Sequence, residues 1–177
     1  GIDGANLALV ALTGPICLLA LVLHVLTSPP SRTFCLLVLL EMAALYGVFT
    51  ALNFFNWFLF FELCLVPAFL LIKLFGGAGR DRAAINFFLF TVVGSAPMLI
   101  GFLAVAAAGG TFDFAELATF AASGGLAEKL GPATPWVALG VLLGLWVKTP
   151  LLPLHLWQPD AYTEAPAPVS LLLSALL

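Results

Sequence analysis

Apolar runs of about 20 residues constrain this chain more than any other feature. About 20 consecutive apolar residues form a helix long enough to cross the hydrocarbon core of a bilayer. Short stretches rich in proline, glycine or asparagine, which end helices, separate the runs. The runs cover approximately residues 5–26, 33–52, 54–75, 83–108 and 135–157, and a sixth begins near Ala165. We therefore predict an all-α polytopic membrane protein built as a helical bundle.

Composition excludes the soluble classes of protein. The 177 residues are 63% hydrophobic and 8% charged, whereas soluble domains carry about 25% charged residues. The net charge of −3 provides no basic stripe for nucleic acid. The three cysteines stand singly, without the spacing of a zinc or iron–sulfur site, and no glycine-rich nucleotide motif occurs. We therefore predict no metal or cofactor in this chain, no nucleic-acid partner, and a lipid bilayer around it.

Charge in the loops indicates the orientation. One side of the membrane carries four basic residues, Arg32, Lys73, Arg80 and Arg82. The other side carries Asp3 and the long loop 109–135, in which Lys129 is the single basic residue. The positive-inside rule places the first side in the cytoplasm. In the long loop, we predict a short surface helix capped by Thr111, with Phe114, Leu117 and Ala121 on one face.

A lysine interrupts the fifth run where charge is costly. Lys148 at bilayer depth costs roughly 2.5–3.5 kcal/mol even on lenient insertion scales, and such residues usually have a function. Pro150 and Pro153 follow, and each removes a backbone donor and leaves a carbonyl that lipid cannot satisfy. We predict a discontinuous helix that faces protein or water, as in ion pathways. Gly140 and Gly144, four residues apart, permit close helix contact.

Two carboxylates lie inside predicted spans and are candidate partners of Lys148. Glu62 lies about eight residues into the third run, and Pro67 weakens the helix just beyond it. Glu41 lies at a similar depth in the second run and is a possible site residue. At about 6 Å and an effective dielectric of about 20, a carboxylate stabilises the charged amine by about 3 kcal/mol. An acid that moves or is neutralised can therefore switch the lysine between holding and releasing a proton. Spacing does not decide the partner, although Glu62 is preferred, and a purely structural ion pair is the alternative.

The sequence suggests roles for three further polar residues. His155 follows Lys148 by seven residues, two helical turns, so it either relays protons on the same face or binds carbonyls freed by Pro153. His24 ends the first run, where a snorkelling side chain is the expected role. Asp160 either caps a helix or holds the turn before the sixth run.

Three stretches of the sequence carry a resemblance to a known family. They are residues 60–67 with the glycine pair 76–77, residues 82–91, and residues 147–166. They resemble the antiporter-like membrane subunits of respiratory complex I, the NADH-quinone oxidoreductase, and in particular the subunit M or chain 4 family. The opening residues 1–4 resemble the start of that family's third helix. The likeness runs over essentially the whole chain and is most specific in 147–166.

The resemblance implies a protein of 14 helices with two inverted five-helix repeats. Residues 1–177 would then be a fragment holding about helices 3 to 8 and most of the first repeat. Glu62 would be the essential carboxylate of helix 5, Lys148 the lysine of the broken helix 7 in a proton half-channel, and His155 the histidine beyond the break. The chain departs from the family pattern at Gln158 and Tyr162, where leucine and histidine are usual.

The implied function is proton translocation across an energy-conserving membrane. The chain would be a membrane-arm subunit of an NADH:quinone oxidoreductase, a translocase with no redox chemistry of its own. NADH, FMN, iron–sulfur clusters and quinone would reside in partner subunits. A bacterial inner membrane is the preferred location, with thylakoid and mitochondrial inner membranes as alternatives. The competing functions are an Mrp-type monovalent cation/proton antiporter subunit, a membrane subunit of a hydrogenase complex, and a purely structural membrane subunit.

Overall fold

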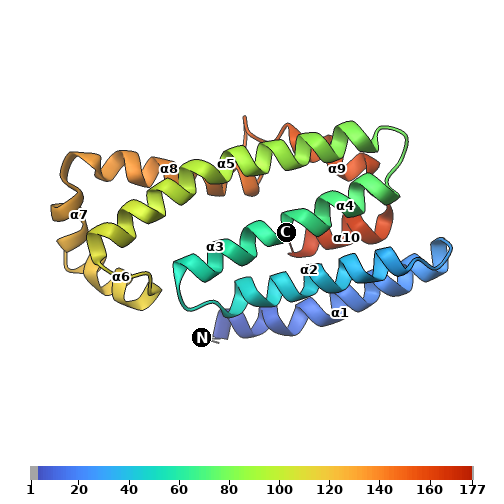
Figure 1. Ribbon diagram of the computed structural model, residues 1–177, viewed down its shortest axis with the longest axis horizontal. Coiled ribbons are helices and arrows are strands. Elements are labelled where there is room, and N and C mark those ends of the chain that lie inside the picture. The colour runs from blue at the N-terminus through green and yellow to red at the C-terminus, as the bar shows by residue number, and fades with distance from the viewer. Residues whose placement is uncertain (1–3, 177) are drawn as a thin grey trace.

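The computed structural model describes residues 4–176, and this part of the chain is a bundle of helices joined by loops (Figure 1). Asp3, which we placed on the outer side, lies outside the described residues. Five helical segments are long and apolar enough to cross a membrane. The helices are α1 (Gly4–Thr27), α2 (Arg32–Thr50), α3 (Phe54–Leu63), α4 (Leu65–Phe75), α5 (Arg80–Gly109), α6 (Phe114–Ala122), α7 (Gly125–Leu130), the 3-10 turn η1 (Gly131–Ala133), α8 (Thr134–Lys148), α9 (Trp157–Glu164) and α10 (Ala167–Leu176). The predicted all-α polytopic fold is confirmed, and the first four predicted spans match to within about three residues. The fifth, predicted as 135–157, instead ends as a helix at Lys148.

The loops gather at two opposite ends of the bundle, as the orientation argument requires. At one end, Phe54 donates its N–H to the Phe112 carbonyl (2.8 Å), and Phe114 donates to the Leu52 carbonyl (3.2 Å). These bonds tie the α2–α3 loop to the long loop that contains α6 and α7, at the left of Figure 1. At the other end, the loop 76–79 contacts the end of α9. Loops assigned to the same side of the membrane therefore do lie together.

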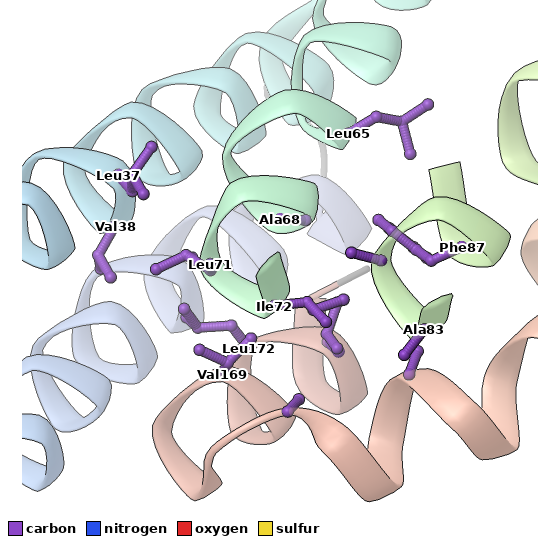
Figure 2. Packing of buried hydrophobic residues seen from close by; sticks show 14 of the residues in the cluster. Leu37, Val38, Leu65, Ala68, Leu71, Ile72, Ala83, Phe87, Val169 and Leu172 are labelled. Atoms are coloured by element: carbon purple, nitrogen blue, oxygen red, sulfur yellow. The ribbon is translucent and has the colours of Figure 1, made fainter. Parts of the chain in front are cut away.

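The buried core lies where α4 packs among α2, α5 and α10 (Figure 2). Leu71 and Ile72 of α4 are 1% and 0% exposed, and Val169 of α10 is fully buried. Apolar side chains also cover much of the outer surface, as Leu26 (75% exposed) and Val93 (68% exposed) illustrate. A surface of that kind suits lipid, because no water-facing polar face is present on these helices.

Glycines bring α5 and α8 into close contact. A Cβ atom added at Gly144 would lie 3.0 Å from the Gly94 carbonyl oxygen, and one added at Gly140 would lie 2.8 Å from the Pro97 carbonyl oxygen. The prediction that Gly140 and Gly144 permit close helix contact is therefore confirmed. Gly94 and Gly101 on α5 have the same role. A Cβ added at Gly94 would lie 2.6 Å from Val147 Cβ, and one added at Gly101 would lie 2.9 Å from the Val137 carbonyl oxygen.

Two local expectations were wrong. The cap of α6 is Asp113, whose Oδ1 accepts from the N–H groups of Ala115 (2.8 Å) and Glu116 (3.1 Å). Thr111 instead accepts the Asp113 N–H, because the helix begins two residues later than the capping argument supposed. His24 does not snorkel: it is 4% exposed and stacks on Phe34 with ring centroids 3.7 Å apart.

Candidate functional site at a broken helix

Pro67 weakens the third span just beyond Glu62 without breaking it. Pro67 has no N–H to donate to the Leu63 carbonyl, so one backbone hydrogen bond is missing from this turn. Cys64, between α3 and α4, keeps helical dihedral angles (φ −59°, ψ −28°), and its carbonyl still accepts from the Ala68 N–H (3.4 Å). The third span therefore continues as one helix from α3 into α4. Glu62 lies in the last turn before the missing bond, where we predicted the weakening.

The fifth span breaks directly after Lys148. α8 ends there, residues 149–156 form turns, and α9 begins at Trp157. Three carbonyls of the helix end have protein donors. The Leu145 carbonyl accepts from the Thr149 N–H (2.9 Å), and the Trp146 carbonyl accepts from the Leu151 N–H (3.1 Å). The Val147 carbonyl accepts from the indole N–H of Trp157 (2.9 Å). The predicted discontinuous helix is thus present, with protein groups satisfying its backbone.

The amine of Lys148 lies against an aromatic side chain of α3. Its Nζ is 4.0 Å from the centroid of the Phe61 ring, a cation–π distance. Lys148 also lines a cavity of about 480 Å³ together with Phe61 and Cys64. The cavity reaches Ala51 and Phe114 near the outer loops, and it has room for several water molecules. Lys148 is therefore only partly buried by protein, with its charge beside a cavity.

Two carboxylates lie near this lysine. Lys148 interacts electrostatically with Glu62 most strongly, and with Glu41 as well. The distances exceed those of a direct pair, since no described carboxylate oxygen lies within 4.0 Å of its Nζ. Glu41 is fully buried, and both of its oxygens lack a hydrogen-bond donor within the described residues. One oxygen of Glu62 is also buried without a partner. These are ionisable groups that the fold holds close without neutralising them as a tight ion pair.

Two residues that we had not singled out complete the surroundings of the acids. Ser95 of α5 is buried and interacts with the Glu62 side chain, and its hydroxyl donates to the Val92 carbonyl (3.0 Å). The Cys64 side chain interacts with Glu41. The position of Cys64 between Glu62 and Pro67 is a pattern that could have indicated it. Ser95 is an isolated hydroxyl in an apolar run, and no local pattern indicates it.

His155 does not share a helical face with Lys148. The two-turn spacing assumed a continuous helix, whereas α8 ends at Lys148 and His155 lies in the turns that follow. Its Nδ1 is buried without a partner in the described part of the chain. The carbonyl beside Lys148 is bound by Trp157. Sequence reasoning missed this bond because the irregular backbone 149–156 lies between donor and acceptor.

Asp160 and Glu164 hold α9 to its neighbours. Asp160 Oδ2 accepts from the Asn86 amide (3.4 Å) and lies 4.0 Å from Arg82 Nε. Glu164 Oε2 accepts from the Gly79 N–H (2.8 Å). Asp160 lies within α9 and its contacts are with α5, so they match neither of the two roles considered for it, a helix cap or the holding of the turn.

Comparison with known proteins supports a single family. Residues 51–177 match the model of the family described as NADH:quinone oxidoreductase/Mrp antiporter, TM. The whole chain aligns with NAD(P)H-quinone oxidoreductase chain 4 of Gloeobacter violaceus at 40% identity, covering 33% of that protein. The chain thus spans about a third of the length of the curated relatives it matches.

Two solved structures share the fold. A chain of respiratory complex I from Thermus thermophilus matches with a TM-score of 0.76 and 36% identity, over 98% of this chain and 35% of that one. A chain of the membrane-bound sulfane sulfur reductase, an archaeal respiratory membrane complex, matches with a TM-score of 0.71 and 27% identity, over 81% of this chain and 28% of that one. The chain is an integral, multi-pass membrane protein and belongs to the NADH:quinone oxidoreductase/Mrp antiporter transmembrane family.

Proposed function

We propose that this chain translocates protons as part of the antiporter-like subunit of an NADH:quinone oxidoreductase. One observation carries the proposal: the amine at the end of the broken helix α8 lies beside a cavity, within electrostatic reach of the buried acid Glu41 and the half-buried acid Glu62, neither of which it contacts directly. A tight structural ion pair would have placed amine and carboxylate within about 3 Å. Loose placement lets the charge of one group change the proton affinity of the other.

In this proposal Lys148 carries the proton and Glu62 controls it. While Glu62 is ionised, it stabilises the charged amine. When Glu62 is neutralised or its distance grows, the amine releases its proton into the cavity. Glu41, which acts on Lys148 less strongly, is a second acid that influences the same amine. His155 keeps its proposed place in the pathway as a group beyond the helix break.

The energy source and the remaining subunits belong to this proposal as well. The relatives are subunits of oxidoreductase complexes. Electron transfer through NADH, FMN, iron–sulfur clusters and quinone would take place in partner subunits. This chain would contribute about helices 3 to 8 of a 14-helix subunit, with other membrane-arm subunits as its lateral partners.

The test uses Glu62→Gln and Lys148→Ala in the full-length protein, assembled in its complex. We expect each variant to reduce NADH-driven acidification of membrane vesicles at least severalfold while the complex still assembles. Glu128→Gln is the matched control, because Glu128 is an exposed carboxylate in α7. Wild-type pumping in both site variants would overturn the proposal.

The Mrp-type antiporter remains the second candidate, since the family model covers both classes. Sodium-dependent proton exchange that needs no NADH, and that Lys148→Ala abolishes, would favour it. Dependence of proton movement on electron transfer would favour the oxidoreductase subunit.

A further inference from the structure

Helix α9 is anchored at its first residue to the end of α8. The indole N–H of Trp157 donates to the Val147 carbonyl at 2.9 Å in a buried contact. The ring is 6% exposed and packs on Phe87 of α5, with centroids 5.2 Å apart. Val147 directly precedes Lys148. The indole therefore holds the peptide unit from which the site lysine extends.

The Val147 carbonyl needs this donor because the backbone supplies none. In a continuous helix it would accept the N–H of Leu151. Here the Leu151 N–H donates instead to the Trp146 carbonyl, because the chain turns at Pro150. An unpaired carbonyl inside the bilayer is costly. Trp157 is thus the protein donor that completes the helix end beside Lys148.

Helix α9 is anchored at its last residue to the loop that follows α4. The Glu164 carbonyl accepts from the Gly77 N–H (2.9 Å), and Glu164 Oε2 accepts from the Gly79 N–H (2.8 Å). The approach is close, since a Cβ added at Gly77 would lie 2.7 Å from Oε2 and one added at Gly79 would lie 2.7 Å from Oε1. Glycine at these positions lets the loop fold around the glutamate.

These two anchors join α8 to α4. The first anchor lies one residue before Lys148, and the second lies at the far end of α4, the part of the third span that follows Glu62. We propose that α9 is a positioning element that fixes Lys148 relative to Glu62, with Trp157 and Glu164 as its positioning residues. A role of α9 in proton transfer rests on the proposed function. Its role in fixing the geometry of the helix end at Lys148 is independent of that function.

The first experiment compares Trp157→Phe with Trp146→Phe in the full-length protein within its complex. Both changes keep an aromatic ring and remove an indole N–H. Trp146 is 39% exposed, and its indole donates to no residue that the structure describes. Hydrogen–deuterium exchange is measured over residues 145–152. We expect exchange there to rise about tenfold in Trp157→Phe, the ratio expected for one buried carbonyl left unpaired, and to stay unchanged in Trp146→Phe.

The second experiment compares Glu164→Ala with Glu164→Gln. Glutamine keeps an oxygen that can accept the Gly79 N–H, whereas alanine does not. We expect Glu164→Ala to lower the number of protons moved per NADH oxidised by at least twofold, with assembly and NADH oxidation retained, and Glu164→Gln to restore most of it. A general packing defect would instead reduce assembly in proportion to activity.

The outcomes test the positioning role of α9 and the proposed function of the site separately. Unchanged exchange in Trp157→Phe overturns the positioning role, whatever the function of the site. If Trp157→Phe fails to assemble, the Glu164 pair decides: equal proton-to-electron ratios in Glu164→Ala and wild type also overturn it. Normal pumping in Lys148→Ala, together with faster exchange in Trp157→Phe, rejects the proposed function and leaves the geometric role of α9 standing.

Discussion

Adding one methyl group at Gly94 should displace the end of α8 and impair the site without unfolding the protein. A Cβ at Gly94 would lie 2.6 Å from Val147 Cβ, whereas carbon atoms pack at about 3.6 Å. The two helices must therefore separate by about 1 Å at this level. Val147 directly precedes Lys148, so the displacement is transmitted to the lysine.

The expected stability change is small because two effects oppose each other. Overpacking of a tight contact costs about 1–3 kcal/mol, while alanine in place of glycine within a helix stabilises by about 0.5–1 kcal/mol. The net loss is therefore at most about 2.5 kcal/mol. A displacement of about 1 Å at a reacting group, in contrast, can lower a rate by about a hundredfold.

The assay measures the initial rate of NADH-driven proton translocation in vesicles, alongside the thermal stability of the assembled complex. We expect Gly94→Ala to lower translocation at least tenfold with a modest loss of stability. The double variant Gly94→Ala/Val147→Gly removes the opposing Cβ, and it should recover a large part of the rate. Wild-type translocation in Gly94→Ala, or no recovery in the double variant, would refute the reasoning from this contact.

Three further predictions test individual residues. Glu62→Gln should reduce translocation more than Glu41→Gln, because Lys148 interacts more strongly with Glu62; the reverse order in the vesicle assay would reassign the controlling acid. Asp113→Ala should weaken α6 by about 1 kcal/mol and speed amide exchange at Ala115 and Glu116, whereas Thr111→Ala should leave these two amides nearly unchanged. His24→Phe keeps the ring that stacks on Phe34 and removes a buried nitrogen without a partner, so it should raise the unfolding free energy by about 1–2 kcal/mol; a loss of translocation with normal stability would show that this nitrogen has a functional role.

Much of the candidate site was readable from local sequence. Pro67 five residues after Glu62 indicates a weakened helix, and Pro150 two residues after Lys148 indicates a broken one, because proline removes a donor wherever it stands. The apolar runs fixed the spans for a similarly local reason: the length of a helix that crosses a bilayer follows from its rise per residue. The resemblance of residues 147–166 to a known family led to the same lysine.

Contacts between helices that are distant in the sequence could not be predicted in this way. The faces of these helices that meet lipid are as apolar as those that meet protein, so hydrophobic periodicity does not report how each helix is rotated. His24 was therefore placed at the surface although it is buried. The roles of Ser95 and Gly94 likewise depend on which side of α5 meets α3 and α8.

By itself, the sequence determined that this chain is a membrane bundle, that its fifth span is broken and its third weakened by proline, and that an amine and two acids lie within predicted spans. Only the tertiary structure decided that both acids come near Lys148 without a direct ion pair, that Trp157 completes the helix end beside the lysine, and that Glu164 meets the loop 76–79. The physical reason is the separation along the chain of the groups that interact. Span length and proline breaks follow from bonding within a few residues, whereas these contacts join groups up to 85 residues apart, which only the packing of whole helices brings together.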